Sequence, residues 1–227
     1  NFGGWRLYRR GRREGEEQMR ALVLALLWPF AALAEGERAG DFDYYVLSLS
    51  WSPTWCALEG DARGSPQCDD DAGFGWVLHG LWPQNERGWP SYCRTGVRDP
   101  SRRDTAAMAD IMGSGGSAWH QWKKHGRCSG LSSEDFFALA REAYGRIVRP
   151  EVFRMLERDV KLPASVVEQA FLEENEALVA DGITITCKSG RIQEARICLT
   201  RGLEPRECGA DVVRDCTMSD ALFESMP

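Results

Sequence analysis

The sequence contains few histidines and no excess of positive charge, and both shortages limit the functions open to it. Only three of its 227 residues are histidine, and 28 lysines and arginines stand against 34 aspartates and glutamates, a formal net charge of -6. Proteins that hold nucleic acid by bulk charge are basic, because neutralisation of phosphates dominates such binding. Any contact between this chain and a nucleic acid is therefore expected to be local.

Two catalytic or metal-binding patterns are also missing. The chain has no Gly-x-Ser-x-Gly segment, so an activated serine of the nucleophile-elbow type is not expected. It has no Cys-x-x-Cys pair either, and its eight cysteines stand far apart, which disfavours a structural zinc site. An even number of widely spaced cysteines is typical of disulfides formed in an oxidising compartment. The spacing alone does not choose among the possible pairings.

The apolar run near the start of the chain is too short to cross a membrane. It extends from Ala21 to Leu33, against the roughly 20 residues that a spanning helix needs, and Pro29 interrupts it. Arg20 precedes the run and an Ala-Leu-Ala segment ends it at Ala34, which is the pattern of a secretory signal. We therefore expect export, with cleavage after Ala34.

This signal divides the chain into two parts. We expect residues 1–34 to be an N-terminal extension and signal peptide, in which Met19 is a candidate for the true start, and residues 35–227 to form a single domain. The exported part holds 22 basic and 31 acidic residues, a net charge of -9. We expect it to be a secreted or periplasmic monomer that is not attached to a membrane.

Hydrophobic patterns in the second part alternate between those of strands and those of helices, which indicates an α+β fold. Strands are predicted at Tyr44 to Ser50, Gly75 to His79, Ile183 to Cys187 and Arg191 to Thr200. Helices are predicted at Asp104 to Met112 with Asp104 as cap, Trp119 to Cys128, Phe136 to Val148, and along Val166 to Leu178. Asn85 to Arg103 is polar and interrupted by glycine and proline, so we expect a long loop, and such loops are often functional.

Two of the three histidines lie in the stretch from Trp119 to Cys128. On a helix, where each residue advances by about 100°, one face carries four polar side chains: His120, Gln121, Lys124 and His125. The opposite side carries Trp119 and Trp122, which we expect to be buried. Such a polar face suits an anionic substrate, and a solvated basic surface is the ordinary alternative.

The third histidine, His79, ends a predicted buried strand, where a side chain is accessible to a ligand. Two histidines that titrate near neutral pH can act as base and acid, and a lysine can stabilise negative charge as it develops. These groups are what metal-free phosphoryl transfer needs, so we expect no cofactor. A three-histidine zinc site is disfavoured, because His120 and His125 are five residues apart rather than four and Lys124 lies between them.

Two segments resemble the active-site segments of a known family. His79-Gly80-Leu81-Trp82-Pro83 and the later segment His-Gln-Trp-Lys-Lys-His-Gly-Arg-Cys, residues 120–128, are similar to those of the T2 family of ribonucleases in length and in order. The resemblance extends over essentially the whole exported part. It implies an antiparallel sheet flanked by helices and stabilised by disulfides, and a secreted or periplasmic endoribonuclease.

The resemblance also implies the chemistry. His125 would take the proton from the ribose 2′-OH, the 2′ oxygen would attack phosphorus, and His79 would protonate the departing 5′ oxygen. The product would be a 2′,3′-cyclic phosphate that later opens to a 3′-phosphate. Lys124 would stabilise charge on the phosphate oxygens, and His120 would bind phosphate. DNA lacks the nucleophile, so RNA is the expected substrate and no stable binding of DNA is expected.

Three aromatic residues are the expected base-binding groups. Trp82 resembles a platform on which a base can stack, and packing beneath the strand end is the alternative for its indole. Trp89 and Tyr92 in the long loop are further candidates for the same role.

Gln121 departs from the family, which usually has glutamate at this position. The exchange removes a carboxyl group but keeps an N–H donor for the phosphate. We therefore expect a reduced rate or a shifted pH optimum. A second hypothesis is a catalytically weak or inactive member of the family that binds RNA or a partner protein, and a third, less favoured, is a zinc-dependent hydrolase.

The family pattern also implies disulfide pairs. Cys93–Cys128 would tie the loop after His79 to the end of the histidine segment. The remaining pairs would be Cys187–Cys216 and Cys198–Cys208, which leaves Cys56–Cys68.

Overall fold

The structure is a computed structural model, and it describes residues 37–227. The predicted signal peptide, its cleavage site after Ala34 and the candidate start at Met19 lie outside the described residues. Among residues 37–227, no helix combines the length and the apolar character needed to cross a membrane.

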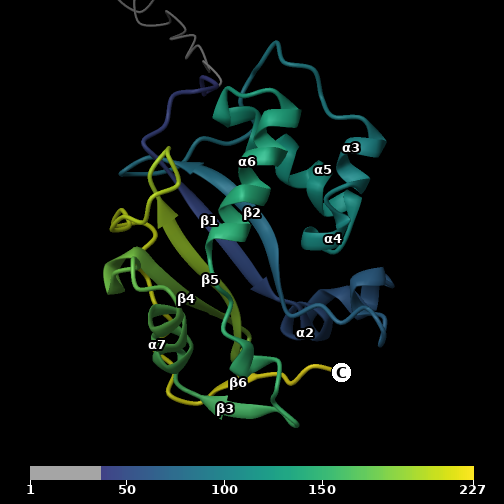
Figure 1. Ribbon diagram of the computed structural model, residues 1–227, viewed down its shortest axis with the longest axis vertical. Coiled ribbons are helices and arrows are strands. Elements are labelled where there is room, and N and C mark those ends of the chain that lie inside the picture. Colours follow the sequence, from purple (N-terminus) through teal and green to yellow (C-terminus); the bar gives the residue numbers. More distant parts are fainter. Residues whose placement is uncertain (1–36) are drawn as a thin grey trace, which may run out of the picture. The chain divides into compact units, whose positions relative to one another are not determined.

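The described residues form a six-stranded sheet with helices beside it (Figure 1), which confirms the predicted α+β fold. The strands are β1 (Tyr44–Trp51), β2 (Trp76–Gln84), β3 (Val160–Leu162), β4 (Ile183–Lys188), β5 (Arg191–Leu199) and β6 (Ala221–Phe223). Their order is β2-β1-β5-β6-β3, and β4 pairs with β5. All pairs are antiparallel except β5 with β6. β2 is therefore an edge strand.

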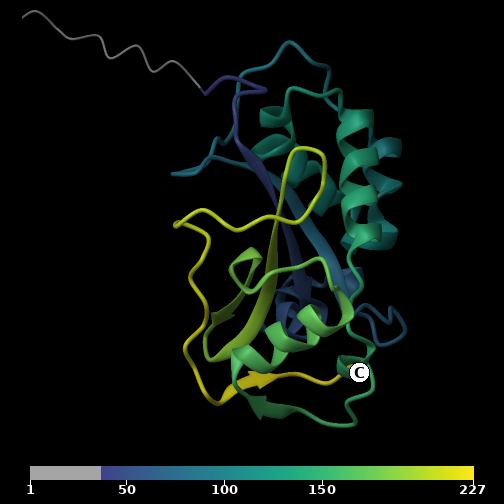
Figure 2. The same cartoon turned by 60° about the vertical axis from the view of Figure 1, so that its left-hand side comes forward.

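Helices flank the two ends of this sheet. They are α2 (Ser52–Trp55), α3 (Arg102–Ala106), α4 (Ala109–Met112), α5 (Gly115–Lys124), α6 (Ser133–Arg146) and α7 (Ala164–Glu174). α5 and α6 lie beside β2, and α7 lies beside β4 near the opposite end (Figures 1 and 2). The two predicted active-site segments, on β2 and α5, are thus neighbours.

Alternation of side chains along β1 gives the sheet two different faces. The first face carries the main hydrophobic core and takes every second residue of β1: Tyr45, Leu47, Leu49 and Trp51. α5, α6 and α7 contribute to that core with Trp122, Phe136 and Phe171. The second face carries Ser48 and Ser50, which lie opposite Arg196 and Glu194 of β5. Polar groups that could do chemistry are therefore gathered on the second face.

The helices agree with their predicted positions but not with all of their predicted ends. The segment 104–112 divides into α3 and α4, and the predicted cap Asp104 is wrong. Ser101 caps α3 instead: its hydroxyl accepts from the Asp104 N–H, and the Asp104 carboxylate accepts from the Ser101 N–H at 2.8 Å. α6 begins after Ser132, whose side chain accepts from the Asp135 N–H.

The four disulfides of the structure are the pairs that the family resemblance implies. They are Cys56–Cys68, Cys93–Cys128, Cys187–Cys216 and Cys198–Cys208. No cysteine among residues 37–227 is free. Two of the bridges tie β4 and β5 to the C-terminal segment, and Cys93–Cys128 ties the loop after β2 to the residues after α5.

Candidate active site

His79 lies within β2 and not at its end, which corrects the predicted strand boundary. On the neighbouring strand β1, Ser48 pairs with Gly80 and Leu49 pairs with Leu78. His79 is therefore an extra residue without a partner on β1, a β-bulge. Bulges reorient side chains and are frequent beside active sites.

The bulge brings His79 and Trp82 to the same face of the sheet. Strict alternation would place His79 with Leu81 and would place Trp82 on the opposite face. Leu81 instead lies in the main core, while Trp82 packs with the smaller cluster on the second face. The rings of His79 and Trp82 meet edge to face, with 5.3 Å between their centroids.

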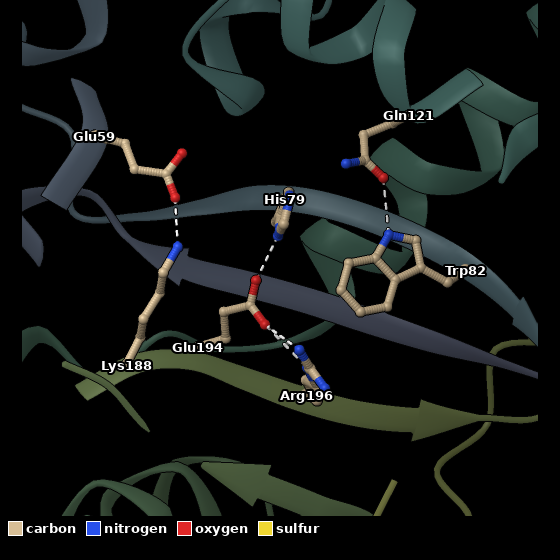
Figure 3. Close-up of polar contacts among 7 residues, drawn as sticks. All are labelled: Glu59, His79, Trp82, Gln121, Lys188, Glu194 and Arg196. Carbon is tan, nitrogen blue, oxygen red and sulfur yellow. Dashed lines mark hydrogen bonds and ion pairs between the residues drawn. The ribbon is translucent and has the colours of Figure 1, made fainter. Parts of the chain in front are cut away.

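Glu194 of β5 is hydrogen-bonded to His79 (Figure 3). His79 Nδ1 lies 2.5 Å from Glu194 Oε1, and the Arg196 guanidinium donates to Glu194 Oε2 at 2.9 and 2.7 Å. The side chain of Glu194 is 3% exposed, against 41% for His79. Burial raises the pKa of the Glu194 carboxyl, but the hydrogen bonds and charges of His79 and Arg196 outweigh it and lower that pKa to about 2. The site therefore contains a buried carboxylate that is ionised at neutral pH.

Neither Glu194 nor Arg196 is among the site residues predicted from the sequence. Both are charged residues in a predicted strand, and a separation of two places them on one face. The sequence signal that could have identified them is this pair of opposite charges in a strand. Charged side chains are seldom buried unless they are paired, so two of them on one face of a strand indicate a polar site.

His125 lies at the end of α5 and not on its regular face. The helix ends at Lys124, four residues before the predicted end, and His125 has φ -121° and ψ -46°. Its N–H donates back to the carbonyl of Gln121 at 2.9 Å. The His125 residue is 5% exposed, and its ring stacks on Trp82 with 5.1 Å between centroids and 25° between planes.

The surroundings of His125 keep its ring neutral. Burial, followed by the positive charges of Lys124, His79 and His120, lowers its pKa from 6.5 to about 3. Among the residues described, the buried Nδ1 of this ring has no hydrogen-bond partner. A neutral imidazole keeps one nitrogen that can accept a proton, so His125 has the protonation state of a base at pH 7.

Gln121 holds Trp82 between the two histidines. The Trp82 indole N–H donates to Gln121 Oε1 at 2.8 Å (Figure 3). Because an indole N–H can only donate, this bond fixes the orientation of the amide and turns its NH₂ group elsewhere. Gln121 is 4% exposed yet borders the cavity beside His79. It is a buried member of the site and not part of a solvated helix face.

Gly80 makes the close approach of these two side chains possible. A Cβ at position 80 would lie 2.3 Å from Trp82 Nε1 and 2.4 Å from Gln121 Oε1. Any side chain there would have to move one of the two groups. The glycine between His79 and Trp82 is therefore required by the packing of the site.

A cavity of about 750 Å³ opens beside His79, within the size range of ligand sites. Residues from five elements form part of its wall: His79, His120, Gln121, Glu194, Glu59 and Lys188. Glu59 and Lys188 form an ion pair at 2.5 Å. Partial burial, followed by the charges of Lys124 and His79, lowers the pKa of the exposed His120. Lys124 is half-buried beside His125.

The predicted loop at 85–103 is fixed to the end of α5. Three contacts hold it: the hydrogen bond of 2.8 Å from the Tyr92 N–H to the Lys124 carbonyl, the disulfide Cys93–Cys128, and the ion pair of Asp99 with Arg127 at 2.6 Å. The partners of the loop in these contacts, Lys124, Arg127 and Cys128, lie immediately before and shortly after His125 in the sequence. The loop thus supports the position of that histidine.

None of the three aromatic candidates, Trp82, Trp89 and Tyr92, lines the cavity. Trp89 and Tyr92 are 55% and 58% exposed, and neither borders it. Trp122 is buried as predicted, but Trp119 is 40% exposed, which corrects the prediction that both indoles lie in the core. The ammonium of Lys123 lies 5.7 Å from the centre of the Trp119 ring.

The three histidines are not arranged as a metal-binding group. Within residues 37–227, the set of potential ligand atoms that lie within 4.8 Å of one another comprises Cys56, Asp61 and Cys68. The two sulfurs of that set are bonded to each other in a disulfide. Neither group has the geometry of the three-histidine zinc site that the third hypothesis requires.

Together, the fold and the site define a class of disulfide-bonded α+β proteins in which a tryptophan lies between two histidines. The model of the Ribonuclease T2 family matches residues 42–208, and the chain belongs to this family. It is 46% identical over 119 residues to a ribonuclease of Aeromonas hydrophila, covering 52% of each chain. It is 32% identical over 129 residues to a probable ribonuclease of Haemophilus influenzae, covering 52% of this chain and 47% of the relative.

The chain thus spans about half the length of these curated relatives. Its fold is also similar to that of an RNase-related protein from Calystegia sepium, with a TM-score of 0.62 and 19% identity. That likeness covers 82% of this chain and 97% of the other. At this identity it shows the fold alone.

Proposed function

We propose that the protein is a metal-independent endoribonuclease that cleaves single-stranded RNA by transphosphorylation. The observation that carries the proposal is the pair of histidines on either side of Trp82, one open to the cavity and the other buried and neutral. General acid–base catalysis needs two such groups held on rigid elements. Membership of the Ribonuclease T2 family supports the same reaction.

In the first step, His125 accepts the proton of the ribose 2′-OH as the 2′ oxygen attacks the adjacent phosphorus. The bond from phosphorus to the 5′ oxygen breaks, and His79 gives its proton to that oxygen. The products are an RNA with a 2′,3′-cyclic phosphate and an RNA with a free 5′-OH. Because the pKa of His125 is lowered to about 3, its ring is neutral at pH 7 and keeps a nitrogen that can accept this proton.

Three side chains of α5 would act on the phosphate. Lys124 and His120 supply positive charge where negative charge develops on the phosphate oxygens. Gln121 supplies the amide NH₂ that its bond to Trp82 leaves available. Gln121 is neutral at every pH, so unlike a glutamate it cannot donate a carboxyl proton.

In the second step, water opens the cyclic phosphate to a 3′-phosphate. His79, which has lost its proton, takes one from water, and His125 returns its proton to the 2′ oxygen. The protein thereby returns to its starting protonation state. Neither step needs a metal ion.

The substrate is proposed to be single-stranded, because a base must leave its stack to reach an aromatic side chain. Trp82 is the proposed platform nearest the histidines, and the exposed Trp89 and Tyr92 would contact bases further along the strand. The four disulfides support a secreted or periplasmic location. We propose that the protein is a monomer that binds neither membranes nor, stably, DNA.

The test is to incubate the purified, oxidised protein with RNA and with DNA of the same sequence, with and without a chelator. Cleavage of RNA alone, undiminished by the chelator, is expected. His79→Ala and His125→Ala should each lower kcat by about 10²-fold or more, since either removes a general acid or base. A near-normal rate in either variant would contradict the acid–base pair.

Because Gln121 stands where the family usually has glutamate, a second candidate function is that of a protein that binds RNA or a partner protein without turnover. RNA that is retained by the protein but recovered intact at every pH from acidic to neutral would favour this function.

A further inference from the structure

We infer that Glu194 is a positioning residue for His79. Its buried carboxylate holds the imidazole with Nδ1–H toward the sheet, which leaves Nε2 to exchange protons with the substrate. Arg196 in turn holds the second oxygen of that carboxylate. The inference rests on the proposed function, in which His79 acts as the general acid.

The carboxylate is held rigidly enough to orient the ring. Glu194 lies on β5, with Ser50 of β1 opposite on one side and Thr186 of β4 on the other. Each of its oxygens has a partner, His79 at Oε1 and Arg196 at Oε2. Because the side chain is 3% exposed, an unpaired charge there would be costly, so both partners are needed.

Arg196 connects this pair to the rest of the site. Figure 3 shows both Arg196 and Trp82, and the guanidinium lies 5.3 Å from the centre of the Trp82 ring. Trp82 in turn stacks on His125. A continuous series of contacts therefore runs from His79 through Glu194, Arg196 and Trp82 to His125. The arrangement fixes the acid relative to the base as well as to the sheet.

The chemical consequence concerns the tautomer of His79. A neutral imidazole carries one N–H, and the carboxylate keeps that hydrogen on Nδ1. When His79 donates in the first step, it loses the proton on Nε2 and keeps the one on Nδ1. In the second step, Nε2 takes a proton from water. Without Glu194, the ring could rotate or adopt the other tautomer, in which Nε2 cannot act as base.

Several charged groups face His79, and Glu194 differs from the others. Glu194 faces it from β5, Glu59 from the helical turn Cys56–Gly60, and His120 and His125 from the region of α5. Arg196 acts on Glu194, and Lys124 acts on His120 and His125. Within the described part of the chain, Glu194 is the residue whose side chain is hydrogen-bonded to the ring. It offsets the positive groups around the charged form of His79.

The first experiment compares Glu194→Gln with a matched control, Glu142→Gln. Glu142 is an exposed residue of α6 that pairs with Arg146, so the control removes the same charge away from the site. Glu194→Gln should lower kcat by about 10²-fold, the low end of the effect of a general acid, with KM little changed. The alkaline limb of its kcat profile should move to lower pH, because the charged ring loses its anionic partner. The control should match the parent protein.

The double variant Glu194→Gln with Arg196→Gln guards against a failure to fold, because it leaves no arginine without its carboxylate. It should show the same loss of kcat and the same movement of the pH profile. Either folded variant with the kcat and pH profile of the parent would overturn the inference.

A measurement on the unaltered protein does not depend on turnover. Nitrogen-15 NMR should show that the neutral His79 ring carries its hydrogen on Nδ1. A neutral ring with its hydrogen on Nε2 would overturn the role of Glu194. A parent protein that leaves RNA intact would instead refute the proposed function, while the NMR result would still decide the tautomer.

Discussion

Replacing Gly80 by alanine should damage the site through a single added methyl group. The new Cβ would lie 2.3 Å from Trp82 Nε1 and 2.4 Å from Gln121 Oε1, so at least one of these side chains must move. Overpacking of a buried site costs about 1–3 kcal/mol, and the lost hydrogen bond between Trp82 and Gln121 costs about 1 kcal/mol more. We expect the free energy of unfolding to fall by about 2–4 kcal/mol.

The effect on activity should exceed the effect on stability. Trp82 contacts both His79 and His125, and a displacement of about 1 Å in an active site can cost about 10²-fold in rate. Urea denaturation and initial rates of RNA cleavage would measure the two effects. Gly145→Ala is the control, because Gly145 lies in the last turn of α6 and a Cβ there meets nothing within 4 Å. It should change the free energy of unfolding by less than about 1 kcal/mol and leave the rate unchanged.

A Gly80→Ala variant with normal stability and a normal rate would refute the packing argument. A normal rate with reduced stability would show that the bond between Trp82 and Gln121 does not affect the histidines.

Three further predictions concern pH, Gln121 and a disulfide. The pKa of His125 is lowered from 6.5 to about 3, so the neutral ring contributes stability that is full above pH 6.5 and is lost as the pH falls. Between pH 7 and pH 5, the free energy of unfolding measured with urea should fall by about 2 kcal/mol more in the parent protein than in His125→Asn. An equal fall in the two proteins would contradict the buried neutral ring. Gln121→Glu should raise the pKa of His125 by adding a negative charge, and should move the acidic limb of the kcat/KM profile to higher pH by about one unit. An unchanged acidic limb would show that residue 121 does not influence the pKa of His125. Replacing Cys93 and Cys128 together by alanine opens a loop with a sequence separation of 35. It should lower the free energy of unfolding by about 4 kcal/mol and reduce activity, and an unchanged rate would show that the bridge does not support His125.

The parts of the fold that could be predicted are those with a long periodic pattern. β1 combines apolar and aromatic residues over eight residues, and β5 has aliphatic residues recurring over nine. α6 has apolar residues at helical spacing over 14 residues. β3 and β6 have three residues each and pair with one another, so neither has a pattern of its own. Such short strands depend on contacts that are distant in the sequence.

The position of His79 could not be predicted because a bulge changes the alternation of β2. The residue pattern from Trp76 to Gln84 contains both His79 and Trp82, which regular pleating would place on opposite faces. The register against β1 shows that one residue has no partner. Register is a property of the pair of strands, and the sequence of β2 alone does not contain it.

The helical wheel placed the right residues near one another but misjudged their surroundings. His125 is beyond the end of α5, and Gln121 is buried against Trp82 instead of facing solvent. Gly126 follows His125, and a Cβ there would lie 2.6 Å from the Trp122 ring, so close packing accompanies the end of the helix. These contacts come from other elements, which a wheel for one helix does not include.

The central claim is that the two histidines cleave RNA through attack by its own 2′-OH. The most direct measurement uses an RNA that carries a single 2′-deoxy nucleotide at one cleavage site, incubated with the protein and a chelator, and identifies the new ends by mass spectrometry. The account predicts 2′,3′-cyclic phosphate at the unmodified sites and no cleavage at the deoxy site. Cleavage at the deoxy site, or new ends that carry a 5′-phosphate, would contradict it.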